Sequence, residues 1–156
     1  MQQQPVIEWA CRSFDQLTLT ELYAILQLRA AVFVVEQTSI YQDVDGKDVN
    51  ALHVTGMDKD QVAAYTRLLP PGVSYKEPSI GRVVVASSHR AYGLGRELMK
   101  RSIEASYRQF GKNSIRISAQ LYLQKFYESL GFGTVSDVYD EDGIPHIEML
   151  LAGPSL

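Results

Sequence analysis

The sequence predicts a single α+β domain, residues 1–156, in which helices cover both faces of a mixed, mostly antiparallel sheet. A length of 156 residues falls within the usual size of one domain. An apolar share of 46% and a charged share of 21% are typical of a globular protein. The periodic segments run strand, helix, three strands, helix, strand, helix and two strands. One strand–helix–strand unit among hairpins requires a pair of parallel strands in an otherwise antiparallel sheet.

The first third of the chain begins with a strand and a capped helix. Apolar and polar residues alternate over 7–11, which predicts a short strand. Thr18 and Glu21 form a capping box, so an amphipathic helix begins there, and its apolar periodicity continues to Val35. Residues 38–50 contain three aspartates and few apolar side chains. This composition predicts a long, solvated surface loop.

The rest of the chain alternates between strand-like and helix-like segments. Expected strands cover 52–56, 62–69, 80–86, 115–119, 134–139 and 146–151, and expected helices cover 95–110 and 123–130. Gly111 and Gly131 follow the two helices, and glycine favours the left-handed conformation that ends a helix. The strands 80–86 and 115–119 flank the crossover helix and are therefore the parallel pair.

Charge and cysteine content exclude several classes of protein. The formal net charge is -3, with 15 Lys and Arg against 18 acidic residues, so we expect no nucleic-acid binding. A single cysteine, Cys11, excludes a disulfide-stapled scaffold. His53, His89 and His146 lack the spacing of metal ligands, so we expect no metal. No signal peptide and no membrane span are predicted, and a cytoplasmic location follows by default.

The segment 83–96 carries the clearest chemical pattern. A valine-rich strand runs into a loop with Gly93 and Gly95, and this loop opens a helix. Unpaired N–H groups at a helix N-terminus attract anions, and glycines let an anion approach the backbone. A pyrophosphate could bind there, with Arg90 and Arg96 adding positive charge. The alternative is that the two glycines only shape a tight turn. The spacings of the P-loop and of the dinucleotide-binding motif are absent.

Three groups of residues resemble a known family. The motif Arg90-x-x-Gly93-x-Gly95 after the valine-rich strand resembles the acyl-CoA pyrophosphate loop of the GNAT N-acetyltransferases. Segment 119–132, which contains Phe126-Tyr127 and ends in Gly-Phe, is similar to the second motif of that family. The resemblance to the ElaA-like group of the family is carried by residues 26–37, 41–46 and 138–147. Together the segments span nearly the whole chain.

This resemblance implies the GNAT fold, whose fourth and fifth strands, here 80–86 and 114–119, splay apart at their ends. It also implies acetyl-CoA as co-substrate, with pantetheine in the splay and pyrophosphate on the glycine loop. Gln120 stands where many relatives have asparagine, and its amide can still reach pantetheine. The residues expected to bind the cofactor are Val83, Val84, Val85, Arg90, Ala91, Tyr92, Gly93, Leu94, Gly95, Arg96, Gln120 and Phe126.

The resemblance further implies direct attack of an amine on the thioester in a ternary complex. Tyr127 matches the family tyrosine that protonates the CoA thiolate, although packing on an apolar helix face is its alternative role. Glu36 is the favoured base, because it follows the first helix where the acceptor cleft is walled. The other candidates for the base or for acceptor binding are Arg29, Phe33, His53, His146 and Glu148. Core packing, ion pairing and local hydrogen bonds are their alternative roles.

We therefore expect an acyl-CoA-dependent N-acyltransferase that moves an acetyl group to a primary amine on a small molecule or peptide. A non-catalytic acyl-CoA-binding or regulatory module on the same fold is the alternative. A second alternative is an acyl-homoserine-lactone synthase, which segment 29–37 also resembles, although such chains are longer. A homodimer is a further expectation, because GNAT proteins often pair through their C-terminal strands.

Overall fold

A computed structural model describes residues 3–154 as one eight-stranded sheet with three α-helices. The strands lie in the order β1-β2-β3-β4-β5-β8-β6, and β7 pairs with another part of β8. Every pair is antiparallel except β4 and β5, which are parallel. The strands are β1 Glu8–Ser13, β2 Leu52–Asp58, β3 Gln61–Leu69, β4 Ser79–Val85, β5 Ile115–Gln120, β6 Gly133–Thr134, β7 Tyr139–Glu141 and β8 Ile144–Leu151. This topology confirms the predicted mixed, mostly antiparallel sheet.

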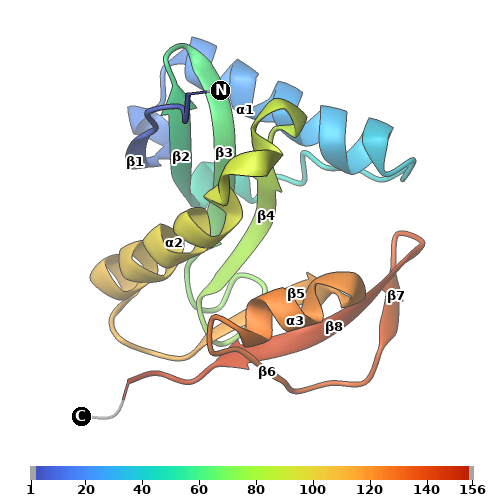
Figure 1. Ribbon diagram of the computed structural model, residues 1–156. Coiled ribbons are helices and arrows are strands. Elements are labelled where there is room, and N and C mark those ends of the chain that lie inside the picture. Colours follow the sequence, from blue (N-terminus) through green and yellow to red (C-terminus); the bar gives the residue numbers. More distant parts are fainter. Residues whose placement is uncertain (1–2, 155–156) are drawn as a thin grey trace.

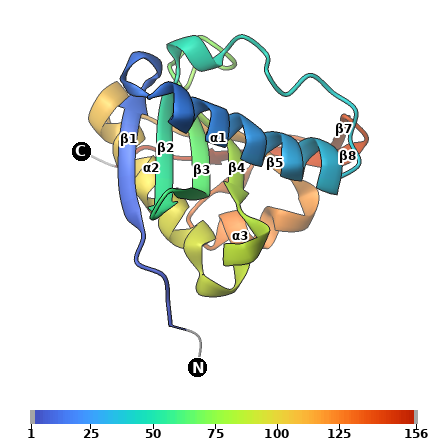
Figure 2. The ribbon, with the colours of Figure 1, turned by 90° about the horizontal axis from the view of Figure 1, so that it is seen from above.

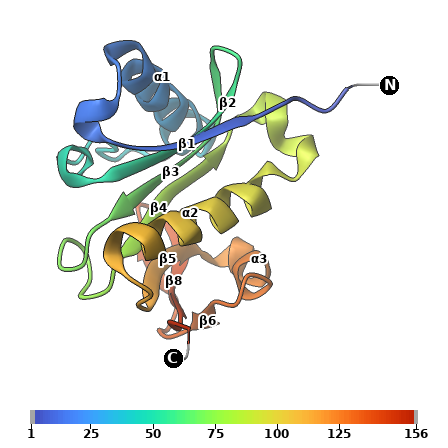
Figure 3. The same cartoon turned by 90° about the vertical axis from the view of Figure 1, so that its left-hand side faces the viewer.

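The helices cover both faces of this sheet, as the sequence predicts. The helices are α1 Leu19–Arg29, α2 Leu94–Phe110 and α3 Gln124–Glu128, and α1 continues as a π-helix over Ala30–Glu36. Figure 3 shows α1 on one side of the strands and α2 and α3 on the other. The capping box is confirmed, since Glu21 N donates to Thr18 Oγ1 and Thr18 N donates to Glu21 Oε1, both at 3.0 Å.

Two apolar clusters hold the layers together. The larger cluster packs α2 and α3 against the sheet and includes the buried side chains of Leu98, Ile117 and Met149. The smaller cluster packs α1 and its extension against the other face, through Ile25 and Phe33. Burial of apolar surface on both faces stabilises the sheet.

β4 and β5 share one register pair, Ser79 opposite Arg116, and then diverge. Figure 1 shows β4 rising away from β5 and β8. The pairing of β3 with β4 slips by one residue between Tyr65 and Arg67, and Arg82 there has a φ of 51°. Such a bulge bends a strand. The splay that the sequence analysis expects between the fourth and fifth strands is therefore present.

Two predicted elements are shorter than expected. The helix expected over 123–130 is limited to α3, because residues 121–123 form a 3-10 turn and Gly131 ends the segment with a φ of 101°. The strand expected over 134–139 is wrong in its middle, since β6 and β7 are separate and pair with different parts of β8.

Candidate active site

The divergence of β4 and β5 opens a cleft of about 980 Å³. Most of the predicted site lines it: Phe33, Glu36, Val83, Val84, Val85, Arg90, Gly93, Leu94, Gly95, Gln120, Phe126, Tyr127 and His146. Six other predicted residues do not line it, namely Ala91, Tyr92, Arg96, Arg29, His53 and Glu148. One cleft thus connects the glycine loop with the start of β8.

The glycine loop gives one end of this cleft an open helix N-terminus. Gly93 is the N-cap of α2 and has a φ of 69°, a left-handed conformation that costs other residues about 1–2 kcal/mol. No side chain caps α2, so its first N–H groups have no side-chain acceptor. A Cβ at Gly95 would meet Phe126 Cζ at 3.8 Å and nothing closer. The backbone is therefore accessible to an anion such as a pyrophosphate.

The other residues of the loop lie beside the cleft. Ala91 and Tyr92 end a short 3-10 helix over Ser87–Tyr92. Arg96 Nη2 donates to Ser129 Oγ at 2.7 Å. Arg96 is the third residue of α2, and its side chain is held by the residue that follows α3.

Arg90 and Glu36 form a bidentate ion pair at the edge of the cleft. Arg90 Nη1 and Nη2 donate to the two oxygens of Glu36, both at 2.7 Å, and Arg90 Nε donates to Val85 O at 3.2 Å. The hydrogen bonds from Arg90 hold the pKa of Glu36 below its usual range. A lowered pKa makes Glu36 a poor proton acceptor near neutral pH, so the geometry favours an orienting role for this carboxylate.

Tyr127 presents an unpaired phenol to the middle of the cleft. Its side chain is 5% exposed, with the ring tilted against Phe126 at 5.2 Å and edge-on to Phe132 at 5.9 Å. Within residues 3–154 its hydroxyl has no hydrogen-bond partner. Burial raises the pKa of Tyr127 well above its usual range. The side chain is therefore a neutral phenol whose proton is free for a group that enters the cleft.

Two hydrogen bonds cross the cleft at the ends of the splayed strands. Gln120 Nε2 donates to Gln37 Oε1 at 3.2 Å, which connects the end of β5 with the segment after α1. Ser39 Oγ donates to Asp142 O at 2.8 Å, which connects the same segment with the β7–β8 turn. Figure 2 shows this segment reaching the β7–β8 turn. The segment after α1 is therefore attached to the β5–β8 side of the cleft at two points.

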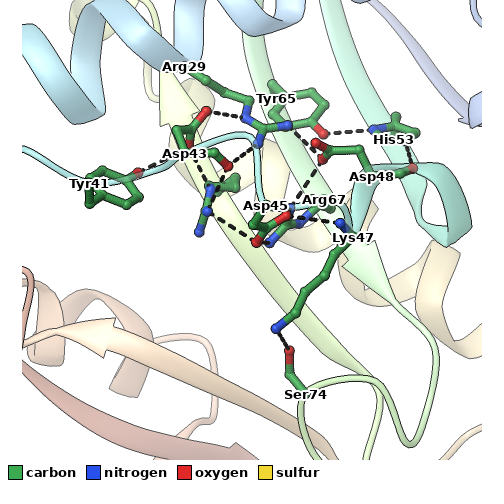
Figure 4. A network of polar contacts seen from close by, with 11 residues as sticks. Arg29, Tyr41, Asp43, Asp45, Lys47, Asp48, His53, Tyr65, Arg67 and Ser74 are labelled. Carbon is green, nitrogen blue, oxygen red and sulfur yellow. Dashed lines mark hydrogen bonds and ion pairs between the residues drawn. The ribbon is translucent and has the colours of Figure 1, made fainter.

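An ion network that the sequence does not predict joins α1, the loop 38–50, β3 and β4 (Figure 4). Arg29 Nε donates to Asp43 Oδ2 at 2.9 Å, and its Nη1 donates to Asp48 Oδ1 at 2.7 Å. The network also contains ion pairs of Arg67 with Asp45 and Asp48, and of Arg82 with Asp43 and Asp45. The prediction of a solvated loop over 38–50 is wrong at Asp43 and Asp48, which are 7% and 5% exposed.

This network buries two of the predicted acceptor-site residues. Arg29 is 0% exposed, and all of its described contacts are to the loop and to Tyr65. His53 is 1% exposed and lies between Tyr65 Oη at 2.7 Å and Asp48 O at 2.9 Å. Desolvation lowers the pKa of His53, which keeps the ring neutral. Both side chains are buried in this network, and neither lines the cleft.

A second polar cluster lies at the other end of the cleft, on β5, β7 and β8. His146 Nε2 lies 3.1 Å from Glu141 Oε2, and His146 Nδ1 lies 2.7 Å from Ile144 O. Ser118 Oγ contacts Tyr139 Oη at 2.5 Å and Glu141 Oε1 at 3.4 Å. Among these residues only His146 is predicted from the sequence. The pairing of β5 and β7 with β8 brings the other residues to His146, and the sequence pattern does not indicate this pairing.

The remaining surface shows two further findings. Within residues 3–154, no three His, Cys, Asp or Glu side chains are grouped as a metal ion requires. No helix in this described part of the chain has the length and apolarity needed to cross a membrane.

A splayed parallel pair with an uncapped glycine loop at its mouth is the arrangement of the GNAT acyltransferases, and the chain belongs to the GNAT family. The family model for the acetyltransferase (GNAT) domain matches residues 21–152. Protein ElaA of Escherichia coli is 42% identical over 146 residues, which are 92% of this chain and 95% of ElaA. Its crystal structure is similar with a TM-score of 0.87 over 93% of this chain and 99% of that one.

Two further structures show how far the similarity extends. An acyl-CoA N-acyltransferase from Pseudomonas aeruginosa is 45% identical, with a TM-score of 0.90 over 94% of this chain and 100% of that one. The acyl-homoserine-lactone synthase LasI is 12% identical, with a TM-score of 0.78 over 95% of this chain and 90% of that one, and shares the fold alone. Membership of the ElaA-like GNAT group implies an acyl-CoA and an acceptor substrate.

Proposed function

We propose that this protein transfers an acetyl group from acetyl-CoA to a primary amine on a small molecule or a peptide. The observation that carries the proposal is one cleft that joins the open N-terminus of α2 to the free phenol of Tyr127 and then to the polar end at His146. A long, anionic thioester at one end and an amine at the other need such a connected cleft. The similarity to an acyl-CoA N-acyltransferase supports the same class of reaction.

In this proposal the glycine loop and β4 hold the coenzyme. The pyrophosphate accepts hydrogen bonds from the first N–H groups of α2, and Arg90, oriented by Glu36, adds charge at the mouth. The pantetheine amides pair with residues 83–85 of β4 along the edge that faces β5. This edge has no neighbouring strand once β5 diverges, while the opposite edge pairs with β3. The cofactor thus replaces the strand pairing that the splay removes.

The chemical step needs a neutral amine, a polarised thioester and a proton for the leaving thiolate. The amine nitrogen attacks the thioester carbon, and the new C–N bond replaces the C–S bond. Tyr127 donates its proton to the thiolate, and the resulting phenolate takes the extra proton from the amide nitrogen. A raised pKa keeps Tyr127 protonated until a thiolate forms beside it. Glu36, engaged with Arg90, is not the base in this scheme.

Calorimetry with acetyl-CoA tests the proposal on the wild type and on Gly95→Leu. A leucine there fills the approach to the α2 N-terminus without a positive φ, so the helix should form normally. Gly133→Leu is the matched control, since Gly133 has open space around it and does not line the cleft. We expect binding by the wild type and the control and loss of binding in Gly95→Leu.

A screen of primary amines with detection of free CoA thiol then tests transfer. Thiol release that requires the amine supports the transferase. Binding of acetyl-CoA without turnover on any amine would favour the non-catalytic acyl-CoA module instead. No binding of acetyl-CoA or of longer acyl-CoAs by the wild type would overturn the proposal.

A further inference from the structure

His146 lines the cleft beside the end of β5. Its register partner on β5 is Gln120, and opposite residues of an antiparallel pair point to the same face. Gln120 is four residues beyond Arg116, and Val83 is four residues beyond Ser79, the last point where β4 and β5 pair. His146 therefore lies beside the end of β5 on the far side of the splay from β4, and His146, Gln120 and Val83 all line the cleft.

The hydrogen bonds of the His146 ring fix which nitrogen can accept a proton. A backbone carbonyl only accepts hydrogen bonds, so the 2.7 Å contact with Ile144 O requires a proton on Nδ1. In the neutral ring Nε2 then carries the lone pair. Nε2 lies 3.1 Å from Glu141 Oε2, and an ionised carboxylate is also an acceptor only. The contact with Glu141 becomes a hydrogen bond only when Nε2 carries a proton, so that the imidazolium donates to Glu141.

The groups around this pair hold Glu141 in place as an acceptor. Tyr139 stacks on the His146 ring at 6.1 Å, and burial raises the pKa of Tyr139, so its phenol stays protonated. The phenol can donate to Ser118 Oγ, and Ser118 can donate in turn to Glu141 Oε1. Gln120 is the polar neighbour of His146 on β5.

Two more charged groups lie along the same face. Glu148 is two residues from His146 on β8, and Arg116 of β5 lies 3.6 Å from it, so that carboxylate is paired. The Glu141 side chain is 47% exposed and has no cationic partner among residues 3–154 apart from His146. Glu141 is therefore the carboxylate through which a proton can reach solvent.

We propose that His146 is the general base of this site, and that Glu141 recognises the cationic form of the acceptor amine. The proposal rests on the proposed acyl transfer. When His146 is neutral, no proton holds Glu141 to Nε2, and an ammonium group binds between the two acceptors. One N–H proton passes to Nε2, the neutral amine attacks the thioester, and the imidazolium is held by Glu141 until its proton leaves to solvent. The acceptor class is a primary amine that is protonated in solution.

The test compares kcat/KM against pH for the wild type, His146→Gln and Glu141→Gln, with an amine that the wild type acetylates. Loss of one general base lowers rates by roughly 10²–10⁴-fold, and we expect His146→Gln to fall in this range. We also expect its pH profile to differ from that of the wild type, because glutamine offers no ring nitrogen that can accept the proton of the amine. Glu141→Gln should raise KM for the amine about tenfold, with a smaller change in kcat, because one charge-assisted contact worth about 1.4 kcal/mol is lost.

Asp140→Asn is the matched control. Asp140 is the neighbouring carboxylate on β7, does not line the cleft, and accepts from Gly143 N, which asparagine can also do. This variant should keep the wild-type profile. Acetyl-CoA binding by calorimetry should stay within twofold in all variants, which separates a loss of base from a loss of fold. An unchanged pH profile in His146→Gln would overturn the role of His146 alone. A wild type that binds acetyl-CoA but acetylates no amine would overturn both proposals.

Discussion

The ion network behind β3 and β4 makes a quantitative prediction for Arg29→Gln. Arg29 is wholly buried and makes three charge-assisted hydrogen bonds of 2.7–2.9 Å, two to Asp43 and one to Asp48. Glutamine is too short to reach both carboxylates. Breaking a buried pair by removing one partner costs about 3–5 kcal/mol, because the remaining charges are left in a low-dielectric wall. The surviving contacts of Arg67 and Arg82 place the expected loss at the lower end of this range.

Urea denaturation and, separately, thermal melting measure this loss of unfolding free energy. For a domain of this size each kcal/mol shifts the melting temperature by about 2–4 °C, so Arg29→Gln should melt roughly 6–12 °C below the wild type. Arg12→Gln is the control, because Arg12 is a half-exposed arginine with one contact of 3.2 Å to Glu21. It should lose less than about 1 kcal/mol. Equal losses in the two variants would refute the assignment of Arg29 to the structural network.

Three other predictions follow from single side chains. Burial alone would raise the pKa of Asp45, but the hydrogen bond from Arg67 and the contacts around it outweigh burial and lower the pKa to about 2. Its stabilisation is complete above the unfolded pKa near 3.9 and is lost as pH falls toward about 2, so urea midpoints should fall over this window, less so in Asp45→Asn. Tyr127→Phe should lower kcat by roughly 10²–10⁴-fold in the thiol-release assay, yet leave the urea midpoint unchanged, because the hydroxyl has no partner in the described chain. Gly93→Ala should lose about 1–2 kcal/mol of unfolding free energy from its φ of 69°, and a variant as stable as the wild type would contradict that strain.

Local patterns were sufficient to predict most of the fold. The capping box at Thr18 and Glu21 sets the start of α1, and Gly111 follows the end of α2, because these contacts are made within a few residues. The alternation over 115–119 and the β-branched strand before the glycine loop identified the parallel pair. The lining of the cleft by Gly93, Gly95 and Tyr127 agrees with where the motifs place a cofactor site, and binding itself stays a prediction.

The rest of the site depends on contacts between distant segments. Three aspartates in a glycine-containing loop have the composition of a solvated surface, and only the fold brings them onto Arg29, Arg67 and Arg82. Glu36 lies 54 residues from Arg90, so the ion pair that lowers its pKa has no local pattern. Glu141 meets His146 through the β7–β8 hairpin register. Side-chain chemistry was visible in the sequence, while its pairing was not.

The single register pair between β4 and β5 has a mechanical consequence. The sheet consists of two panels, β1–β4 and β5–β8, which share one register pair at Ser79, and the segment after α1 makes two hydrogen bonds to the second panel and its β7–β8 turn. In our proposal the pantetheine arm pairs with the free edge of β4. The bound substrate then acts as an additional strand that makes the junction of the two panels more rigid. At a concentration of 100 Kd such a ligand adds about 2.7 kcal/mol to the free energy of unfolding. Hydrogen exchange along the free edge of β4 should therefore slow each time the coenzyme binds and recover each time it leaves.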